Sequence, residues 1–177
     1  MAYTTIDDPS AHFHIQLYTG NASDDRDITN DANAGDFKPD WLWIKERNDT
    51  SSHQLIDSNR GARYSVLTDS NNAEDDDQNR IQAFNTDGFQ VGTASTVNEN
   101  NKTYVAWQWK ANGGTATATI SESGSNPAAS VQANTTAGFS IITYTGTGSQ
   151  GTIAHGLGAT PSMLWIKNRD ASEGWII

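Results

Sequence analysis

The sequence predicts an all-β protein, built as an antiparallel β-sandwich or jelly roll, and three observations carry this prediction. Short segments alternate apolar and polar residues with a period of two, whereas the 3.6-residue period of a helix is almost absent. Turns rich in Asn, Asp and Gly separate these segments. Part of the sequence also occurs twice, which predicts one complete domain followed by the start of a second copy.

The expected strands of the first domain are short and rich in β-branched or aromatic residues. They lie at residues 13–18, 41–45, 64–67, 81–84, 88–91 and 103–110. Between the fourth and fifth, Asp87-Gly88 indicates a tight hairpin, because glycine adopts a positive φ at little cost. We therefore expect the strand after this turn to pair with the strand before it.

The strand at 103–110 closes the first domain, and its two faces differ. One face carries Val105, Trp107 and Trp109, and the other carries Tyr104, Ala106 and Gln108. Because successive side chains of a strand point to opposite faces, only one of these sets can face a given layer. The larger apolar surface predicts that the tryptophan face is the core.

The repeat defines the expected domain boundaries. Residues 18–20 (Tyr-Thr-Gly) and 39–49 return, with substitutions, as residues 144–146 and 161–170. We expect a first sandwich at residues 1–112 with a short N-terminal arm at 1–10, a linker and connecting segment at 113–135, and an incomplete second copy at 136–177. Strands are expected at 139–144 and 163–167.

A counterpart of the closing strand does not follow the second copy within this sequence. Three explanations remain open: the protein continues past Ile177, another chain completes the sheet, or order is lost at that point. In each case the strands of the second copy would expose unpaired edges.

Composition excludes several functions. The chain has a formal net charge of −10 and a pI of about 4.6, which argues against a nucleic-acid partner. We expect no membrane insertion, because no apolar run approaches the length of a spanning helix, and the N-terminus lacks the features of a secretion signal. The absence of cysteine fits synthesis in a reducing cytosol.

The candidate ligand-binding or interface residues are Trp41, Arg47, His53 and Asp57, because aromatic rings with polar side chains are typical of sugar sites. The alternative is structural: Arg60 would hold its loop to Asp57 by a charge-assisted hydrogen bond.

We expect neither catalysis nor a cofactor, because no recognisable catalytic motif occurs. The four histidines lack zinc-ligand spacing, so no metal site is assigned. For the acidic cluster at 74–77 we expect a solvated loop, and Ca²⁺ binding stays open as the alternative.

Four ordered blocks, at residues 37–47, 53–61, 84–92 and 104–109, resemble a domain of tailed-bacteriophage structural proteins. The resemblance implies a concanavalin-like or SPRY-like β-sandwich that is displayed on a virion assembled in the host cytoplasm. It also implies a tail-fibre or tail-associated surface component that acts in assembly and host attachment.

The partners that this resemblance implies are other virion proteins, further copies of the chain, with a homotrimer as the usual fibre assembly, and a host-surface glycan. The alternative is a carbohydrate-binding module or capsid decoration protein with the same fold. A glycan-degrading depolymerase would need a catalytic region that these residues do not show.

Overall fold

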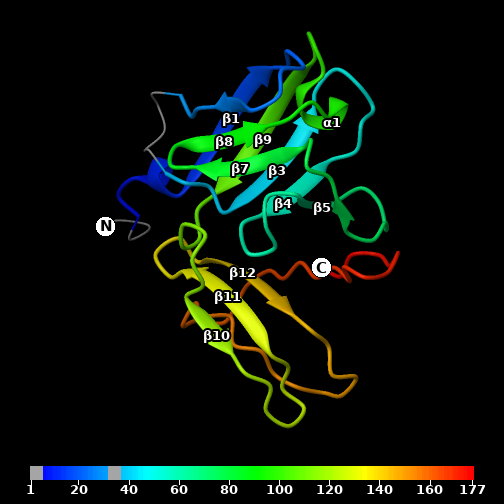
Figure 1. Ribbon diagram of the computed structural model, residues 1–177. Helices are drawn as coiled ribbons and strands as arrows, with labels where there is room; N and C mark the ends of the chain where they lie inside the picture. The colour runs from blue at the N-terminus through cyan, green and yellow to red at the C-terminus, as the bar shows by residue number, and fades with distance from the viewer. Residues whose placement is uncertain (1–5, 32–36) are drawn as a thin grey trace.

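The computed structural model describes residues 6–31 and 37–177, and it confirms a nearly all-β chain with antiparallel sheets (Figure 1). Residues 1–5 of the expected N-terminal arm lie outside this range. The strands of the largest sheet follow the order β1 (Phe13–Thr19), β9 (Thr103–Trp109), β3 (Trp41–Glu46), β4 (Gln54–Asp57), β5 (Tyr64–Leu67) and β6 (Asp75–Asp76). A second sheet has the order β2 (Arg26–Ile28), β8 (Gly88–Val91) and β7 (Ile81–Asn85).

A third sheet lies at one end of this sandwich (Figure 1). Its order is β10 (Ala118–Ile120), β11 (Ala129–Asn134) and β12 (Phe139–Tyr144). The helical elements are the 3-10 turn η1 (Pro9–Ala11) and the single-turn helix α1 (Ser95–Asn98). Within the described ranges, no helix is both long and apolar enough to cross a membrane.

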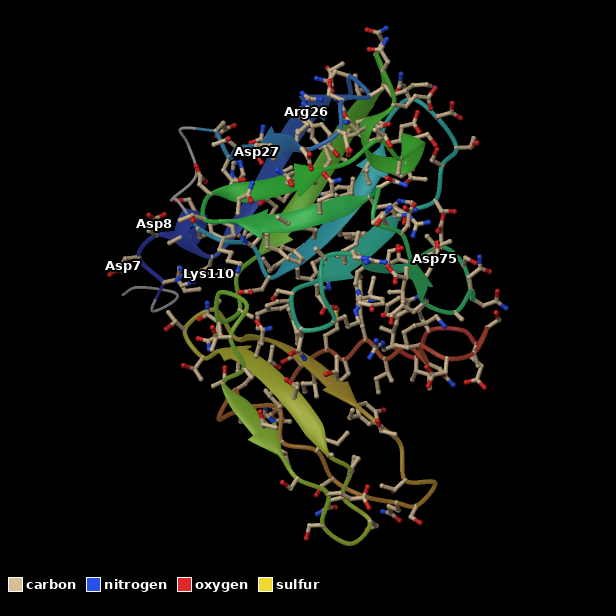
Figure 2. All side chains as sticks on the ribbon, viewed as in Figure 1. Asp7, Asp8, Arg26, Asp27, Asp75 and Lys110 are labelled. Carbon is tan, nitrogen blue, oxygen red and sulfur yellow. The ribbon has the colours of Figure 1, made fainter. Side chains whose placement is uncertain are left out.

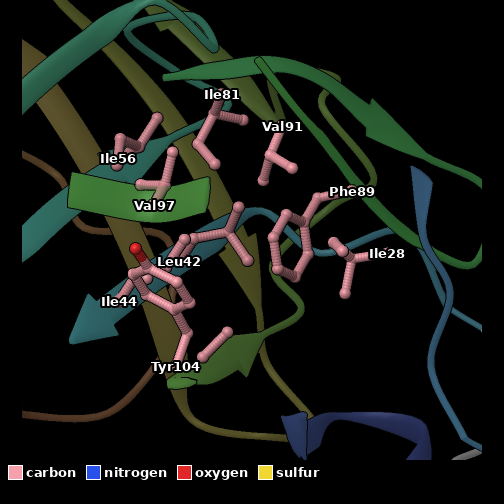
Figure 3. Packing of buried hydrophobic residues seen from close by; sticks show 10 residues of the cluster. Ile28, Leu42, Ile44, Ile56, Ile81, Phe89, Val91, Val97 and Tyr104 are labelled. Atoms are coloured by element: carbon pink, nitrogen blue, oxygen red, sulfur yellow. The ribbon is translucent and has the colours of Figure 1, made fainter. Parts of the chain in front are cut away.

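The main core lies between the six-stranded sheet and the sheet β2-β8-β7 (Figure 3). Leu42 and Ile44 of β3 and Tyr104 of β9 point into it, and Phe89 and Val91 of β8 come from the opposite layer. All five side chains are fully buried. Alternation along β3 and β9 produces this arrangement, because every second residue faces the same layer.

The prediction for the faces of β9 was wrong. Tyr104, Ala106 and Gln108 are fully buried on the side that faces β2-β8-β7, whereas Trp107 and Trp109 lie on the opposite side and are partly exposed. The amide of Gln108 is paired through its nitrogen, because Nε2 donates to Asn30 Oδ1 at 2.6 Å, whereas its Oε1 is buried without a hydrogen-bond partner among the described residues. A buried amide that is hydrogen-bonded costs far less than an unpaired one, so a glutamine can occupy the core face.

The predicted hairpin at Asp87-Gly88 is confirmed. β7 and β8 pair antiparallel, with Asn85 opposite Gly88, and Gly88 has a φ of +99°. A Cβ atom added at Gly88 would lie 2.1 Å from the backbone oxygen of Ile28. Glycine is therefore required here both by the backbone conformation and by the closeness of the neighbouring chain.

Segment 113–135, expected to be a linker, contains two strands, β10 and β11. The alternating pattern of β11 is weak in sequence because its buried side chains include the small residues Ala129 and Ala133 around Val131. The expected strand at 139–144 is confirmed as β12, which pairs with β11. The sequence therefore missed the partner that β12 uses.

A buried carboxylate fixes the point where the chain leaves the sandwich. Asp40 accepts backbone N–H bonds from Ala111 at 2.7 Å, from Gly113 at 2.8 Å and from Gly114. The hydroxyl of Ser58 also donates to Asp40, at 2.7 Å. These four hydrogen bonds satisfy the buried carboxylate, so Asp40 fixes the position of the chain that leads into the third sheet.

The expected strand at 163–167 is not formed as a strand. Within residues 6–31 and 37–177, it forms only an isolated antiparallel bridge, between Ile166 and Ile176. Extended backbone is stabilised as a strand only when a neighbouring strand pairs with it over several residues, and the described residues place no such partner here.

Candidate functional site

The outer side of the six-stranded sheet carries a tryptophan face, which consists of Trp41, Trp43, Trp107 and Trp109. Trp41 lies opposite Trp109 in the register of β3 and β9, and Trp43 lies opposite Trp107. The ring centroids of these two pairs are 4.4 Å and 5.1 Å apart. The period of two on both strands therefore brings four indole rings together on one surface.

Residues from the C-terminal part of the chain cover part of this tryptophan face. Phe139 of β12 lies 6.1 Å from Trp41 in a T-shaped arrangement. Trp165 lies 6.0 Å from Trp41 and 5.8 Å from Trp43, also edge to face. Trp165 in turn contacts Trp175 at 6.2 Å. The third sheet and the segment after it thus pack onto the first sandwich through aromatic side chains.

A cleft of about 280 Å³ opens where this aromatic cover ends. Its lining residues are Trp43, His53, Thr68, Asp69, Trp165, Trp175 and Ile177. The indole N–H of Trp43 donates to Thr68 Oγ1 at 3.0 Å, and the indole N–H of Trp175 donates to the backbone oxygen of Leu67 at 2.8 Å. These bonds fix both rings, and fixed aromatic rings are suitable surfaces for stacking a flat apolar ligand face.

Polar groups stand at one side of the cleft. His53 Nδ1 lies 3.5 Å from Asp69 Oδ2, and the His53 ring lies 5.8 Å from the ring of Trp43. Both side chains are about one-third exposed. A partly solvated carboxylate next to an imidazole can hydrogen-bond the hydroxyl groups of a ligand, so the cleft combines stacking with polar recognition.

A chain of ion pairs holds the C-terminal segment beside the cleft. Asp57 accepts a hydrogen bond from Arg60 Nε, and Arg60 Nη1 lies 2.8 Å from Glu74 Oε2. Glu74 also accepts hydrogen bonds from Arg169, whose backbone oxygen accepts from the Glu74 N–H at 2.8 Å. The predicted lock between Arg60 and Asp57 is therefore confirmed, and it extends to Arg169.

Glu74 is the centre of this ion-pair chain, and its environment changes its pKa. Burial raises the pKa of Glu74, but the hydrogen bonds from Arg169 and Arg60 outweigh burial and hold the pKa below its ordinary value. Glu74 is therefore charged near neutral pH and binds both arginines. The contact between the first sandwich and residue 169 is consequently electrostatic as well as aromatic.

The rest of the acidic cluster at 74–77 also faces arginines. Asp75, which is labelled in Figure 2, lies 2.6 Å from Arg80, and Asp76 lies 2.8 Å from Arg63. Asp77 lies 3.5 Å from Arg80. Each of these three carboxylates is thus paired with an arginine. Among the residues that the structure describes, no group of three or more His, Asp and Glu side chains is arranged to hold a metal ion.

The four residues predicted as a ligand groove or interface lie at two ends of one hairpin. Trp41 and Asp57 oppose each other at one end of the β3–β4 pair, where Asp57 is buried against Arg60. His53 and Arg47 lie beyond the opposite end, past the pair of Ile44 and Gln54. Of the four, His53 lines the cleft, Trp41 belongs to the tryptophan face, and Arg47 is exposed to solvent.

Sequence reasoning missed most of the cleft. Trp43 lies two residues after Trp41, on the same face of the strand, and Trp165 is the counterpart of Trp43 in the repeat. The sequence could therefore have indicated both as candidate site residues. Thr68, Asp69 and Trp175 carried none, because they reach the cleft only through the way the C-terminal segment folds back.

Comparisons with known proteins identify the family. Neither the curated proteins nor the solved structures contain a match to this chain. The matching family model covers the sandwich, the third sheet and the C-terminal segment. That model is described as Domain of unknown function (DUF7483), it matches residues 8–177, and the chain belongs to this family.

Proposed function

We propose that this protein is a structural component of a bacteriophage virion, in a tail fibre or another tail-associated surface position, and that it acts in assembly and host attachment rather than in catalysis. One observation carries the proposal: the third sheet and the C-terminal segment pack onto the tryptophan face of the first sandwich through Phe139 and Trp165. Aromatic contacts of this kind bury apolar surface and hold successive units of the chain together, which supports a structural role in an assembled surface protein.

Two further features support the proposal. The four ordered blocks that resemble tailed-bacteriophage structural proteins fall on elements of the sandwich, among them β3, β4, β8 and β9. The net charge of −10 favours solubility and disfavours contact with nucleic acid, as suits a protein on the outside of a particle.

The test is localisation in a purified particle. Antibodies against residues 8–177 should label virions produced from the genome that encodes this chain, with label at the tail. Mass spectrometry of the same density-purified particles should recover its peptides. If the chain is abundant in the producing cells but absent from purified particles, the proposal is wrong.

The cleft supports a second candidate, a carbohydrate-binding module. Fixed indole rings at Trp43 and Trp175 beside the polar pair His53–Asp69 form the combination that a sugar ring needs. In this case glycans should quench tryptophan fluorescence in a saturable way, and Trp175→Ala should abolish that response. Trp109 is absent from the cleft lining and its ring contacts Phe13, Trp41 and Phe139, so Trp109→Ala is the matched control and should leave binding intact. No saturable response to a broad glycan panel would eliminate this candidate.

A further inference from the structure

The backbone pairing of the C-terminal segment follows the repeat that is present in the sequence. In the first copy, β3 and β4 pair Ile44 with Gln54. In the second, the isolated bridge pairs Ile166 with Ile176. The sequence alignment places Ile166 at the position of Ile44, and both pairs span ten residues. The segment 163–177 thus begins the same hairpin in the same register.

A side-chain interaction is repeated as well. Lys45 Nζ donates to the backbone oxygens of Glu46 and Asp49, one and four residues ahead. Lys167 Nζ donates to the backbone oxygens of Asn168 and Ala171, at the same two offsets. In both copies the lysine side chain therefore closes the turn that follows it in the sequence. The two hairpins share turn geometry and register.

The two hairpins differ in what covers them. Leu42 and Ile44 are fully buried in the first core, whereas their counterparts Leu164 and Ile166 are 55% and 37% exposed. In the first copy β9 pairs with β3 on the side opposite to β4, and the sheet β2-β8-β7 covers Leu42 and Ile44. Around 163–167 the structure shows neither element among its described residues.

We propose that the hairpin 163–177 is a docking surface for the remaining strands of a second sandwich. The occupant is a segment with the pattern of residues 56–112: a strand of the β9 type would pair beside residues 163–168, and an apolar layer of the β7–β8 type would cover Leu164 and Ile166. The proposal does not depend on the virion assignment, because register, turn contacts and exposure carry it.

The experiment supplies this occupant directly. Ile177 is the counterpart of Leu55, so residues 56–112 are joined after Ile177 of the full chain. Hydrogen exchange is then followed at residues 161–170, a sequence that remains unique in the extended protein. We expect exchange there to become slower by at least about tenfold than in the 177-residue chain, because new ladder hydrogen bonds protect the amides.

A matched pair of variants separates docking from non-specific collapse. Leu164→Asp places a charge on the face that is core in the first copy and should remove the added protection. Met163→Asp changes a side chain that is 70% exposed and is the counterpart of Trp41, on the opposite face, so it should retain the protection. Exchange at residues 41–46, also unique in the extended protein, verifies that the first sandwich remains folded in every variant.

The proposal is overturned if the joined residues leave exchange at 161–170 unchanged while residues 41–46 remain protected. It is equally overturned if Leu164→Asp and Met163→Asp reduce the added protection to the same extent, because the docking face would then have no role.

Discussion

Leu42 and Leu164 occupy the same place in the repeated sequence Leu-Trp-Ile-Lys, yet their truncation should have very different effects. Leu42 is fully buried in the core between the two sheets, and Leu164 is 55% exposed. Leu→Ala removes three carbons, which corresponds to about 2.4 kcal/mol of lost transfer free energy at a fully buried site. The cavity left in a packed core raises the expected cost at Leu42 to about 3–5 kcal/mol.

At Leu164 less than half of the side chain leaves solvent, and no enclosed cavity is created by its removal. The expected loss of stability is therefore about 1 kcal/mol or less. Urea unfolding of the two single variants and the parent chain, followed by far-ultraviolet circular dichroism, measures both free energies of unfolding. Equal losses for the two variants would refute the assignment of the core to the β2-β8-β7 side of the sheet.

Three further outcomes test the packing and the electrostatics. Gln108→Ala should lower the free energy of unfolding in urea by about 2–3 kcal/mol, because it empties a buried site and removes the donor to Asn30. A loss below about 1 kcal/mol would contradict the buried position of Gln108. Gly88→Ala should cost at least about 2 kcal/mol more than Gly113→Ala, since a Cβ at Gly113 would meet nothing within 4 Å; similar melting temperatures for the two variants would contradict this. Because the pKa of Glu74 is lowered in the folded chain, its stabilising contribution is complete above its unfolded value of 4.5 and is lost as the pH falls through the lower folded value. Near-ultraviolet circular dichroism should therefore show loss of the tryptophan signal on acidification, and Glu74→Gln should weaken the signal already at neutral pH; a pH-independent signal unaffected by the variant would exclude the ion-pair contact.

Local sequence was sufficient to predict many elements of the first sandwich. Period-two segments located β1, β3, β5, β7, β8 and β9, because alternation is a local consequence of strand geometry. Asp87-Gly88 located a hairpin because only glycine fits its backbone, and the proximity of Arg60 to Asp57 in sequence predicted their ion pair.

The sequence did not determine which face of the sheet is the core. Val105, Trp107 and Trp109 form the more apolar set, and yet Tyr104, Ala106 and Gln108 occupy the core. Both faces of β9 contact other parts of the chain: the sheet β2-β8-β7 lies on one face, and Phe139 contacts Trp109 on the other. The alternating pattern predicts that the two faces of the strand differ, but it does not predict which layer of the structure covers each face.

The cleft likewise depends on long-range packing. Trp175 joins Trp43 and His53 only because Glu74 and Leu67 of the first sandwich bind the C-terminal segment. Sequence alone determined six strands of the first sandwich, the strand β12, the tight turn and the repeat, since these depend on neighbours along the chain. The tertiary structure decided the core face, the partner of β12 and the lining of the cleft, since these depend on contacts between residues that lie far apart in sequence and meet only when the layers assemble.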